Sequence, residues 1–276
     1  MKIKKNYISS ITKDIKKGFK RIYWFIFCKY KYFYLSSHLN GNKEINQHYI
    51  SILLPSRERS IKFKRMLNSI IQTCKNLNRI ELLILLDNDD KEINEYKKII
   101  SEKKYKSLNI FVFIKSLSSH SKRNNYLAEK SKGQIIFPFN DDVVFKSFYW
   151  DDEIDKEFSK VKNMPFCLWV DSGQKYNYLH SDFPIINRNW YEKLGYVGSE
   201  FFHFWYLDTW ICDLSKKSKR FFVSKNIKLF QYSANTIKEE VDSTHLRNIK
   251  DDIPNKDRVI WLNTEKNRLN DSKLLI

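Results

Sequence analysis

The stretch that decides the fold is "QIIFPFNDDVVF", residues 134–145. Its first six residues are almost all apolar and β-prone, which predicts a strand buried on both faces. Asn140, Asp141 and Asp142 follow directly, before the chain turns apolar again. Carboxylates without a compensating charge are costly to bury at the end of a core strand. Either they face water in an ordinary turn, or they hold a positively charged group.

Three earlier segments have the same strand character: "YISILLP" (49–55), "IELLILL" (80–86) and "NIFVFI" (109–114). Helical patterns separate these segments. An apolar stripe that begins after Ser60, a predicted cap, continues to Leu77, and "SKRNNYLAEKSKG" (121–133) predicts a helix with Gly133 near its end. This alternation predicts an α/β fold with an open, mostly parallel sheet and helices on both faces.

Polar residues stand where the predicted strands end. Pro55, Ser56 and Arg57 close the first strand, Asp87 follows the second, and the residues from Asn140 to Asp142 follow the fourth. Ligands of open α/β sheets bind outside the carboxyl ends of the strands. The sequence therefore predicts a binding site along this edge of the sheet.

Composition narrows the class of protein. The chain has 276 residues, of which 42% are hydrophobic and 16% aromatic, as expected of a folded domain. The net charge of +18 favours an anionic partner such as nucleic acid, an acidic membrane surface or a phosphorylated substrate. Six glycines form neither G-x-x-x-x-G-K nor G-x-G-x-x-G. Four scattered cysteines show no zinc spacing and indicate reduced thiols in the cytoplasm.

The first 38 residues differ from the rest. Basic residues occur throughout, and the longest apolar run, Ile22 to Cys28, is far shorter than the roughly 20 residues that span a bilayer. Two interpretations stay open: an amphipathic segment bound peripherally to the anionic inner face of the plasma membrane, or a helix packed on the main domain. Residues 39–48 read as a polar linker, and the main domain is expected over residues 49–276.

The order of these motifs resembles the nucleotide-binding half of GT-A glycosyltransferases, especially those of the family 2 type. The resemblance rests on "ISILLPSRERSIKFKRMLNSII", "IELLILLDNDD" and "HSKRNNYLAEKSKGQIIFPFNDDVVF". It covers residues 50–150 well and continues more loosely to about residue 250. It implies a nucleotide-sugar-binding half over residues 49–150, an acceptor half over 151–250 and a C-terminal tail over 251–276.

The resemblance also implies roles for residues. The donor would be held by Pro55, Ser56, Arg57, Asp87, Lys122, Arg123 and Asp141. Asp87 matches the residue that accepts the N3–H of uracil, and Lys122 and Arg123 match basic residues that approach the diphosphate. Asp141 and Asp142 match the motif that binds Mn²⁺ or Mg²⁺, although the first Asp of the family is Asn140 here. His245 matches a late metal ligand, with His203 as a weaker competitor.

The acceptor half has its own candidates. Asp208 in "WYLDTW" matches the carboxylate that deprotonates the acceptor hydroxyl, and a helix N-cap is its alternative role. The neighbouring aromatic residues are Phe201, Phe202, Phe204, Trp205 and Tyr206. Most of them are expected in the core, although aromatic faces also stack on sugars.

These features predict a metal-dependent glycosyltransferase of the hexosyltransferase type. It would transfer a sugar, with inversion, from a nucleotide-diphosphate donor such as a UDP-sugar to a saccharide or lipid-linked acceptor in surface polysaccharide biosynthesis. A nucleotidyltransferase of similar fold is the first alternative. A nucleic-acid-binding protein would explain the net charge but not the acidic strand ends. A non-catalytic membrane scaffold would explain the N-terminal segment alone.

Overall fold

The computed structural model describes residues 49–161, 164–173, 180–232 and 241–276. All of them belong to one compact unit, residues 46–276. The expectations for residues 1–38 and for the linker over residues 39–48 fall on residues outside this description, as does Cys28. The cysteines that are described, Cys74, Cys167 and Cys212, are free thiols. In the part of the chain that is described, no helix is both long enough and apolar enough to cross a membrane.

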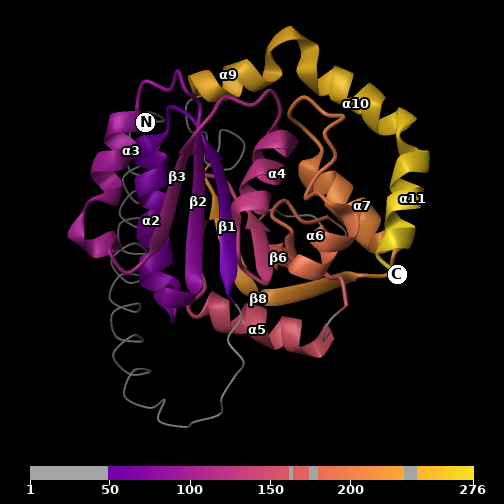
Figure 1. Ribbon diagram of the computed structural model, residues 1–276, viewed down its shortest axis with the longest axis horizontal. Coiled ribbons are helices and arrows are strands. Elements are labelled where there is room, and N and C mark those ends of the chain that lie inside the picture. The colour runs from indigo at the N-terminus through magenta and orange to yellow at the C-terminus, as the bar shows by residue number, and fades with distance from the viewer. Residues whose placement is uncertain (1–48, 162–163, 174–179, 233–240) are drawn as a thin grey trace, which may run out of the picture. The chain divides into compact units, whose positions relative to one another are not determined.

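The first half alternates strands and helices as the sequence predicts. The elements are β1 (Ile50–Ser56), α2 (Ser60–Thr73), β2 (Ile80–Leu86), α3 (Ile93–Ile100), β3 (Asn109–Ile114), α4 (His120–Lys130) and β4 (Ile135–Pro138). All neighbouring pairs among β1 to β4 are parallel, in the order β3-β2-β1-β4. Their carboxyl ends therefore meet at one edge of the sheet (Figure 1).

The second half extends the same sheet with mixed pairing. It contains β5 (Val143–Phe145), α5 (Trp150–Val161), β6 (Cys167–Asp171), β7 (Ile185–Asn187), α6 (Arg188–Leu194), α7 (Leu207–Lys217), β8 (Phe221–Gln231) and α9 (Ser243–Ile249). The strand order continues from β4 as β7-β6-β8-β5. β7 is antiparallel to both β4 and β6, whereas β6 and β8 run parallel. The predicted open, mostly parallel α/β sheet is confirmed.

Alternating residues of the central strands pack into two separate hydrophobic cores, one on each face of the sheet. Ile52 and Leu54 of β1 pack with α2, α3 and α5, whereas Leu53 packs with α4, α6 and α7. Side chains of a strand point to opposite faces in turn, so a strand that is apolar throughout must be covered on both sides. Each side chain that is fully buried in this way contributes about 1.5–3 kcal/mol relative to exposure. The helices on both faces follow from this pattern.

Helix α2 departs from its predicted ends. Ser60 is its first residue rather than its cap: Arg59 takes the cap position without a side-chain hydrogen bond, and the Ser60 N–H donates to Glu92 Oε2 at 2.8 Å. The helix ends at Thr73 and not at Leu77. The carboxylate of Asp151 accepts the N–H groups of the two residues after Cys74, at 2.9 and 3.1 Å, and this holds the chain in a turn.

Residues 251–276, which the resemblance left as a tail, are an integral part of the fold. They form α10 (Ile253–Asn263) and α11 (Glu265–Leu274), which follow α9 in yellow along the edge of Figure 1. Leu275 is fully buried, and Arg268 stacks on Trp261 at 3.6 Å and donates to Asp213 of α7 at 2.7 Å. This segment therefore packs against the helical layer that contains α7.

Gly133 occupies a position that no larger residue fits. A Cβ there would lie 2.6 Å from the Tyr49 carbonyl oxygen and 2.7 Å from the Ser51 nitrogen, both backbone atoms of the β1 region. We expect Gly133→Ala to lower the free energy of unfolding by about 1–3 kcal/mol, since β1 and β4 must separate. Gly195→Asn is the matched control: Gly195 has φ +77° with open space around it, and Asn tolerates that conformation. Equal denaturation midpoints for wild type and Gly133→Ala would contradict this prediction.

Candidate active site

Three adjoining cavities lie at the carboxyl edge of β1, β2 and β4 within the described residues. One of about 470 Å³ is lined by arginines and Asp87, and we call it the arginine cavity. One of about 310 Å³ contains Asp142 and Asp208, and we call it the carboxylate cavity. A small one of about 60 Å³ lies against Pro55, Ser56 and Asp141. His120, Phe204 and Asn248 line all three, so the cavities form one continuous depression.

Asp87 lies in the arginine cavity with guanidinium groups from three parts of the chain. Arg57 after β1, Arg123 on α4 and Arg247 on α9 each donate to its carboxylate, at 3.0, 2.9 and 3.0 Å. Arg57 also donates to Asp89 at 2.9 Å. Two carboxylates thus face three guanidinium groups, which leaves this cavity net positive and suited to an anionic ligand.

His120 adds no charge to this edge. Burial and the neighbouring Arg123 lower the pKa of its imidazole to about 4, while Asp208 opposes the shift only weakly. The ring is therefore neutral at physiological pH. It packs against Phe204, with ring centroids 5.2 Å apart. The positive charge of the depression comes from its arginines.

Asp141 is buried and already engaged on both oxygens. The Ser56 hydroxyl donates to Oδ2 at 2.5 Å, and Arg59 Nη1 donates to Oδ1 at 3.1 Å. Arg59 also donates from Nε and Nη2 to Asp242 at the start of α9, both at 2.8 Å. Burial raises the pKa of Asp141, whereas Arg59 and Ser56 lower it. Arg59 therefore ties the end of β4 to α9.

Asp142, unlike Asp87 and Asp141, forms no ion pair with an arginine in the described residues. It is buried and faces the carboxylate cavity, where Gln231 Nε2 donates to it from 3.3 Å. Burial, reinforced by the charge of Asp141, raises its pKa to about 6. The charges of Arg59 and Lys62 oppose this rise, but neither side chain forms an ion pair with Asp142 in the described residues. A cation in the cavity would supply further compensating charge.

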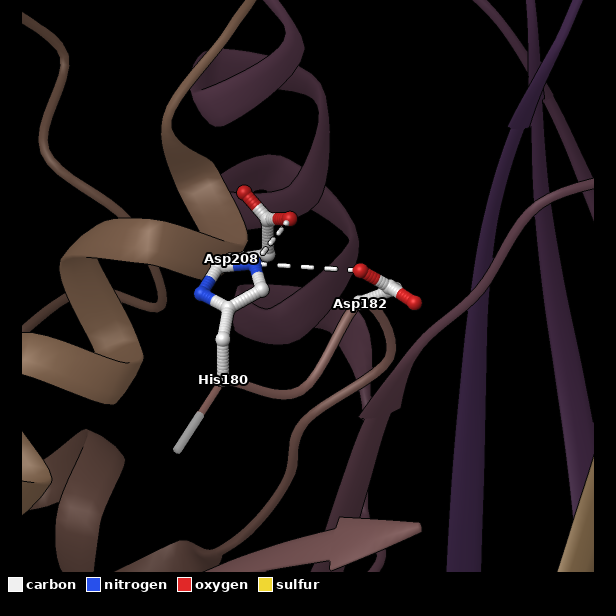
Figure 2. Close-up of side chains that lie close together, drawn as sticks. All are labelled: His180, Asp182 and Asp208. Carbon is white, nitrogen blue, oxygen red and sulfur yellow. Dashed lines mark hydrogen bonds and ion pairs between the residues drawn. The ribbon is translucent and has the colours of Figure 1, made fainter. Parts of the chain in front are cut away.

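Asp208 faces the same cavity from the first turn of α7. Tyr206, with φ 73°, takes the cap position of that helix, so the alternative role of Asp208 as an N-cap is not realised. Its Oδ1 accepts the Thr209 N–H at 2.7 Å, and its Oδ2 lies 3.0 Å from His180 Nε2. Asp182 Oδ1 lies 3.8 Å from the same nitrogen, and in Figure 2 dashed lines join this nitrogen to both carboxylates.

The charge state of His180 reflects these neighbours. Burial lowers its pKa, but the hydrogen bonds to Asp208 and Cys212 outweigh burial and raise the pKa to about 10. The ring therefore carries a proton at neutral pH, directed at a carboxylate. The pair holds the orientation of Asp208 at the cavity wall.

The aromatic segment before α7 does not form core as expected. Phe202 is buried, but Phe201 is 51% exposed and Trp205 36% exposed. Three aromatic residues of this segment, Phe204, Trp205 and Tyr206, line the carboxylate cavity. The reason lies in α10: the buried carboxylate of Asp257 accepts the backbone N–H groups of His203, Phe204 and Trp205 at 2.8–2.9 Å. This turn directs the aromatic faces toward the depression.

No protein-family model matches this chain, and no curated protein matches it. Solved structures do. The mannosyltransferase PcManGT from Pyrobaculum calidifontis, in complex with GDP-Man and Mn²⁺, has a TM-score of 0.52 at 9% identity, over 91% of this chain and 81% of that one. TarS of S. aureus has a TM-score of 0.54 at 12% identity over 67% of this chain. TarS 1–349 in complex with UDP-GlcNAc has a TM-score of 0.51 at 11% identity, over 82% and 70%.

The chain has the GT-A fold. This confirms the prediction that the α/β sheet is that of a GT-A fold. This chain spans 37% of the length of the first TarS structure, so the likeness concerns a part of that protein. On the GT-A fold, the depression described above occupies the edge at which open α/β sheets bind ligands.

The GT-A frame brings most of the predicted site residues together. Pro55, Ser56, Arg57, Asp87, Arg123 and Asp141 line the arginine cavity or the small cavity. Asp142, Asp208 and His245 line the carboxylate cavity. His203 lines the arginine cavity, away from Asp142, and pairs with Asp257 at 2.7 Å.

Lys122 lies apart from these residues. It follows the helix start by two residues and lines a separate groove of about 830 Å³, together with Asn125, Tyr126 and Glu129. Adjacent residues of a helix point about 100° apart, which accounts for the different surroundings of Lys122 and Arg123. The role of Lys122 in donor binding stays a prediction.

Several residues of the site were missed from the sequence. They are Arg59, His120, His180, Asp182, Arg247 and Asp257. Arg59 stands inside the quoted "ISILLPSRERSIKFKRMLNSII" and Arg247 stands two positions after His245, and their charge next to predicted site residues was a usable signal. His180 and Asp257 lie in stretches without a recognisable pattern.

Proposed function

We propose that this protein is a metal-dependent glycosyltransferase that uses a nucleotide-diphosphate sugar. The observation that carries the proposal is Asp142, a buried carboxylate whose pKa stays raised although the charges of Arg59 and Lys62 act on it, and which forms no ion pair among the described residues. It lies on a cavity continuous with an arginine-lined one. A donor that combines a base, a diphosphate and a sugar spans such a series of cavities. The complexes of GT-A neighbours with UDP-GlcNAc and with GDP-Man and Mn²⁺ support the same class of ligand.

The residues present fit a divalent metal at Asp142. Its carboxylate is buried with a raised pKa, and the imidazole of His245 lines the same cavity. Oxygen ligands suit Mn²⁺ or Mg²⁺, and the added imidazole favours Mn²⁺. Such an ion offsets the negative charge that develops on the leaving diphosphate. We propose that Asp141, whose oxygens accept from Ser56 and Arg59, contacts the ribose when the donor binds.

We propose that the acceptor enters at the carboxylate cavity. Asp208 is positioned there to take the proton of an attacking hydroxyl, and Phe204, Trp205 and Tyr206 offer aromatic faces to a sugar ring. Attack opposite the leaving diphosphate inverts the anomeric centre. The acceptor proposed is a saccharide or glycolipid of surface polysaccharide biosynthesis, with a hexose as the transferred sugar.

The experiment that tests the function is a screen of nucleotide sugars for thermal stabilisation in the presence of Mn²⁺. The donor found there is then incubated with saccharide acceptors, and the products are analysed. Release of a nucleoside diphosphate supports the proposal. Release of pyrophosphate from a nucleoside triphosphate would instead identify a nucleotidyltransferase.

The base of the donor is expected to be uracil, read by Asp87. Its Oδ1 accepts Arg123 at 2.9 Å, which leaves one lone pair of that oxygen for the N3–H of uracil. We expect UDP to bind more tightly than GDP or CDP in calorimetry. Asp87→Asn should weaken UDP binding by about 1.5–3 kcal/mol, since a hydrogen bond to a charged group is lost.

The control is Glu95→Gln, which removes the same charge from an exposed position on α3. It should leave UDP affinity unchanged. Equal affinity of the wild type for all nucleoside diphosphates would remove Asp87 from base recognition. Asp87→Asn also removes the negative charge that Arg57, Arg123 and Arg247 share. The repulsion among these guanidinium groups can lower stability, so the melting temperature of the variant must be measured in parallel.

We also propose that residues 1–38 bind an anionic membrane surface, which would place the enzyme on the inner face of the plasma membrane. Deletion of this segment should release the protein from liposomes that contain phosphatidylglycerol, because its basic residues supply the attraction. Sedimentation of full-length and shortened protein with such liposomes measures the effect. Full-length protein that ignores the liposomes at low salt would contradict the proposal.

A further inference from the structure

We propose that His180, Asp182 and Asp208 form a second metal site, selective for an imidazole-binding divalent ion such as Zn²⁺. The nitrogen of His180 and one oxygen of each carboxylate all lie within 4.8 Å of one another. Among the described residues, these three are the one set of His, Cys, Asp or Glu side chains that lie close enough together to share a metal ion. Figure 2 shows dashed lines from one nitrogen of His180 to an oxygen of each carboxylate, and Asp182 and Asp208 line the carboxylate cavity.

The distances suit ligands of a common ion. His180 Nε2 lies 3.0 Å from Asp208 Oδ2 and 3.8 Å from Asp182 Oδ1. Ligands about 2.1 Å from a metal are separated by roughly 3.0–3.4 Å in octahedral or tetrahedral geometry. Small rotations of the carboxylates would bring all three atoms to coordinating distance once His180 Nε2 has released the proton directed at Asp208, because a metal displaces that proton when it binds the ring nitrogen.

Each carboxylate is held by a second hydrogen bond that leaves one oxygen directed at His180. The Ser172 hydroxyl donates to Asp182 Oδ2 at 2.5 Å, so Oδ1 faces the imidazole. The Thr209 N–H donates to Asp208 Oδ1 at 2.7 Å, so Oδ2 faces it. Such outer contacts orient the ligands of metal sites. The three side chains are each 25–35% exposed, so an ion can reach them from the cavity.

This site differs from the one proposed at Asp142 in combining its imidazole with two carboxylates rather than one. An imidazole with two carboxylates suits Zn²⁺ and similar ions, whereas Mg²⁺ prefers oxygen ligands alone. Asp208 is also the proposed base for the acceptor hydroxyl, so this part of the inference rests on the proposed function. An ion bound to Asp208 Oδ2 occupies the lone pair that the base needs. Zn²⁺ should therefore inhibit sugar transfer.

Calorimetry tests the site without any assay of activity. Full-length protein, stripped of metal with a chelator and kept in excess Mg²⁺, is titrated with ZnCl₂. Ser172→Ala should weaken Zn²⁺ binding by about 10-fold, as loss of an outer contact does, and His180→Gln by more. Asp142→Asn should keep the Zn²⁺ binding that Ser172→Ala weakens, because Asp142 is not a ligand of this site. Asp182→Asn, a nearly isosteric change, provides a second ligand variant if His180→Gln fails to fold.

His203→Gln is the matched control for Zn²⁺ binding. His203 pairs with Asp257 at 2.7 Å, but no second carboxylate completes a metal-binding group with it in the described residues. Zn²⁺ affinity that is unchanged in both His180→Gln and Asp182→Asn, or reduced equally in His203→Gln, would overturn the inference. Absence of any sugar transfer would refute the proposed function and leave the calorimetric result standing.

Discussion

Asp142→Asn is expected to lose sugar transfer by about 10³-fold or more, since metal stabilisation of a leaving diphosphate contributes several kcal/mol. The substitution keeps the shape of the side chain but removes the charge that holds the ion. Chelation of the wild type with EDTA should give the same loss, and Mn²⁺ should restore activity to the wild type alone. Release of UDP from a UDP-sugar in the presence of acceptor measures the effect.

The loss should not come from unfolding. Burial raises the pKa of Asp142, which means that the ionised form is unfavourable in the metal-free fold, so the amide should be at least as stable there. Asp251→Asn is the control. Asp251 is exposed and has a left-handed backbone conformation that Asn also adopts, so this variant should transfer sugar normally. Full activity of Asp142→Asn, or indifference of the wild type to EDTA, would end the metal hypothesis.

Asp208→Asn is expected to reduce turnover by roughly 10²-fold or more, the usual contribution of a general base. Asp208 is not the cap of α7, and the Asn oxygen can still accept the Thr209 N–H. The Asn amide then replaces the oxygen that lies 3.0 Å from His180 Nε2, so His180 must release its proton and accept from the amide. With that change of protonation, the fold and UDP affinity should survive while turnover falls. Steady-state kinetics at saturating donor and acceptor measures the difference.

Asp213→Asn is the matched control on the same helix. Asp213 pairs with Lys217 and Arg268, away from the carboxylate cavity, so its loss should affect stability and not turnover. The anomeric configuration of the product provides a second measurement, because attack opposite the leaving group must invert an α-linked donor to a β-linked product. Normal turnover in Asp208→Asn, or a retained configuration in NMR, would remove Asp208 from the mechanism.

The sequence by itself determined the sheet and one side of the site. Fully apolar strands such as β1 and β2 must be covered on both faces, and helical periodicity supplies the covering elements. Because parallel strands end at one edge, polar residues directly after β1, β2 and β4 had to meet there. Arg57, Asp87 and Asp141 are neighbours for this reason, with no tertiary detail required.

Only the tertiary structure decided which residues from the second half of the chain complete the site. Arg247 reaches Asp87 across 160 positions of the chain, and Asp242 meets Arg59 across 183. No local pattern encodes such pairings, since they depend on where α9 lies after the second half has folded. The same holds for the contact between His180 and Asp208. His180 lies in a stretch without a recognisable sequence pattern, and Asp208 lies in the first turn of α7.

The aromatic segment shows most clearly why sequence was insufficient. Hydrophobicity alone predicted core for most of Phe201 to Tyr206, because burial of aromatic area is favourable wherever the backbone permits it. The buried carboxylate of Asp257 instead binds the N–H groups of residues 203–205 and directs their side chains into the cavity. A backbone turn held by a residue some 50 positions later overrides hydrophobic preference, and that geometry exists only in the folded chain.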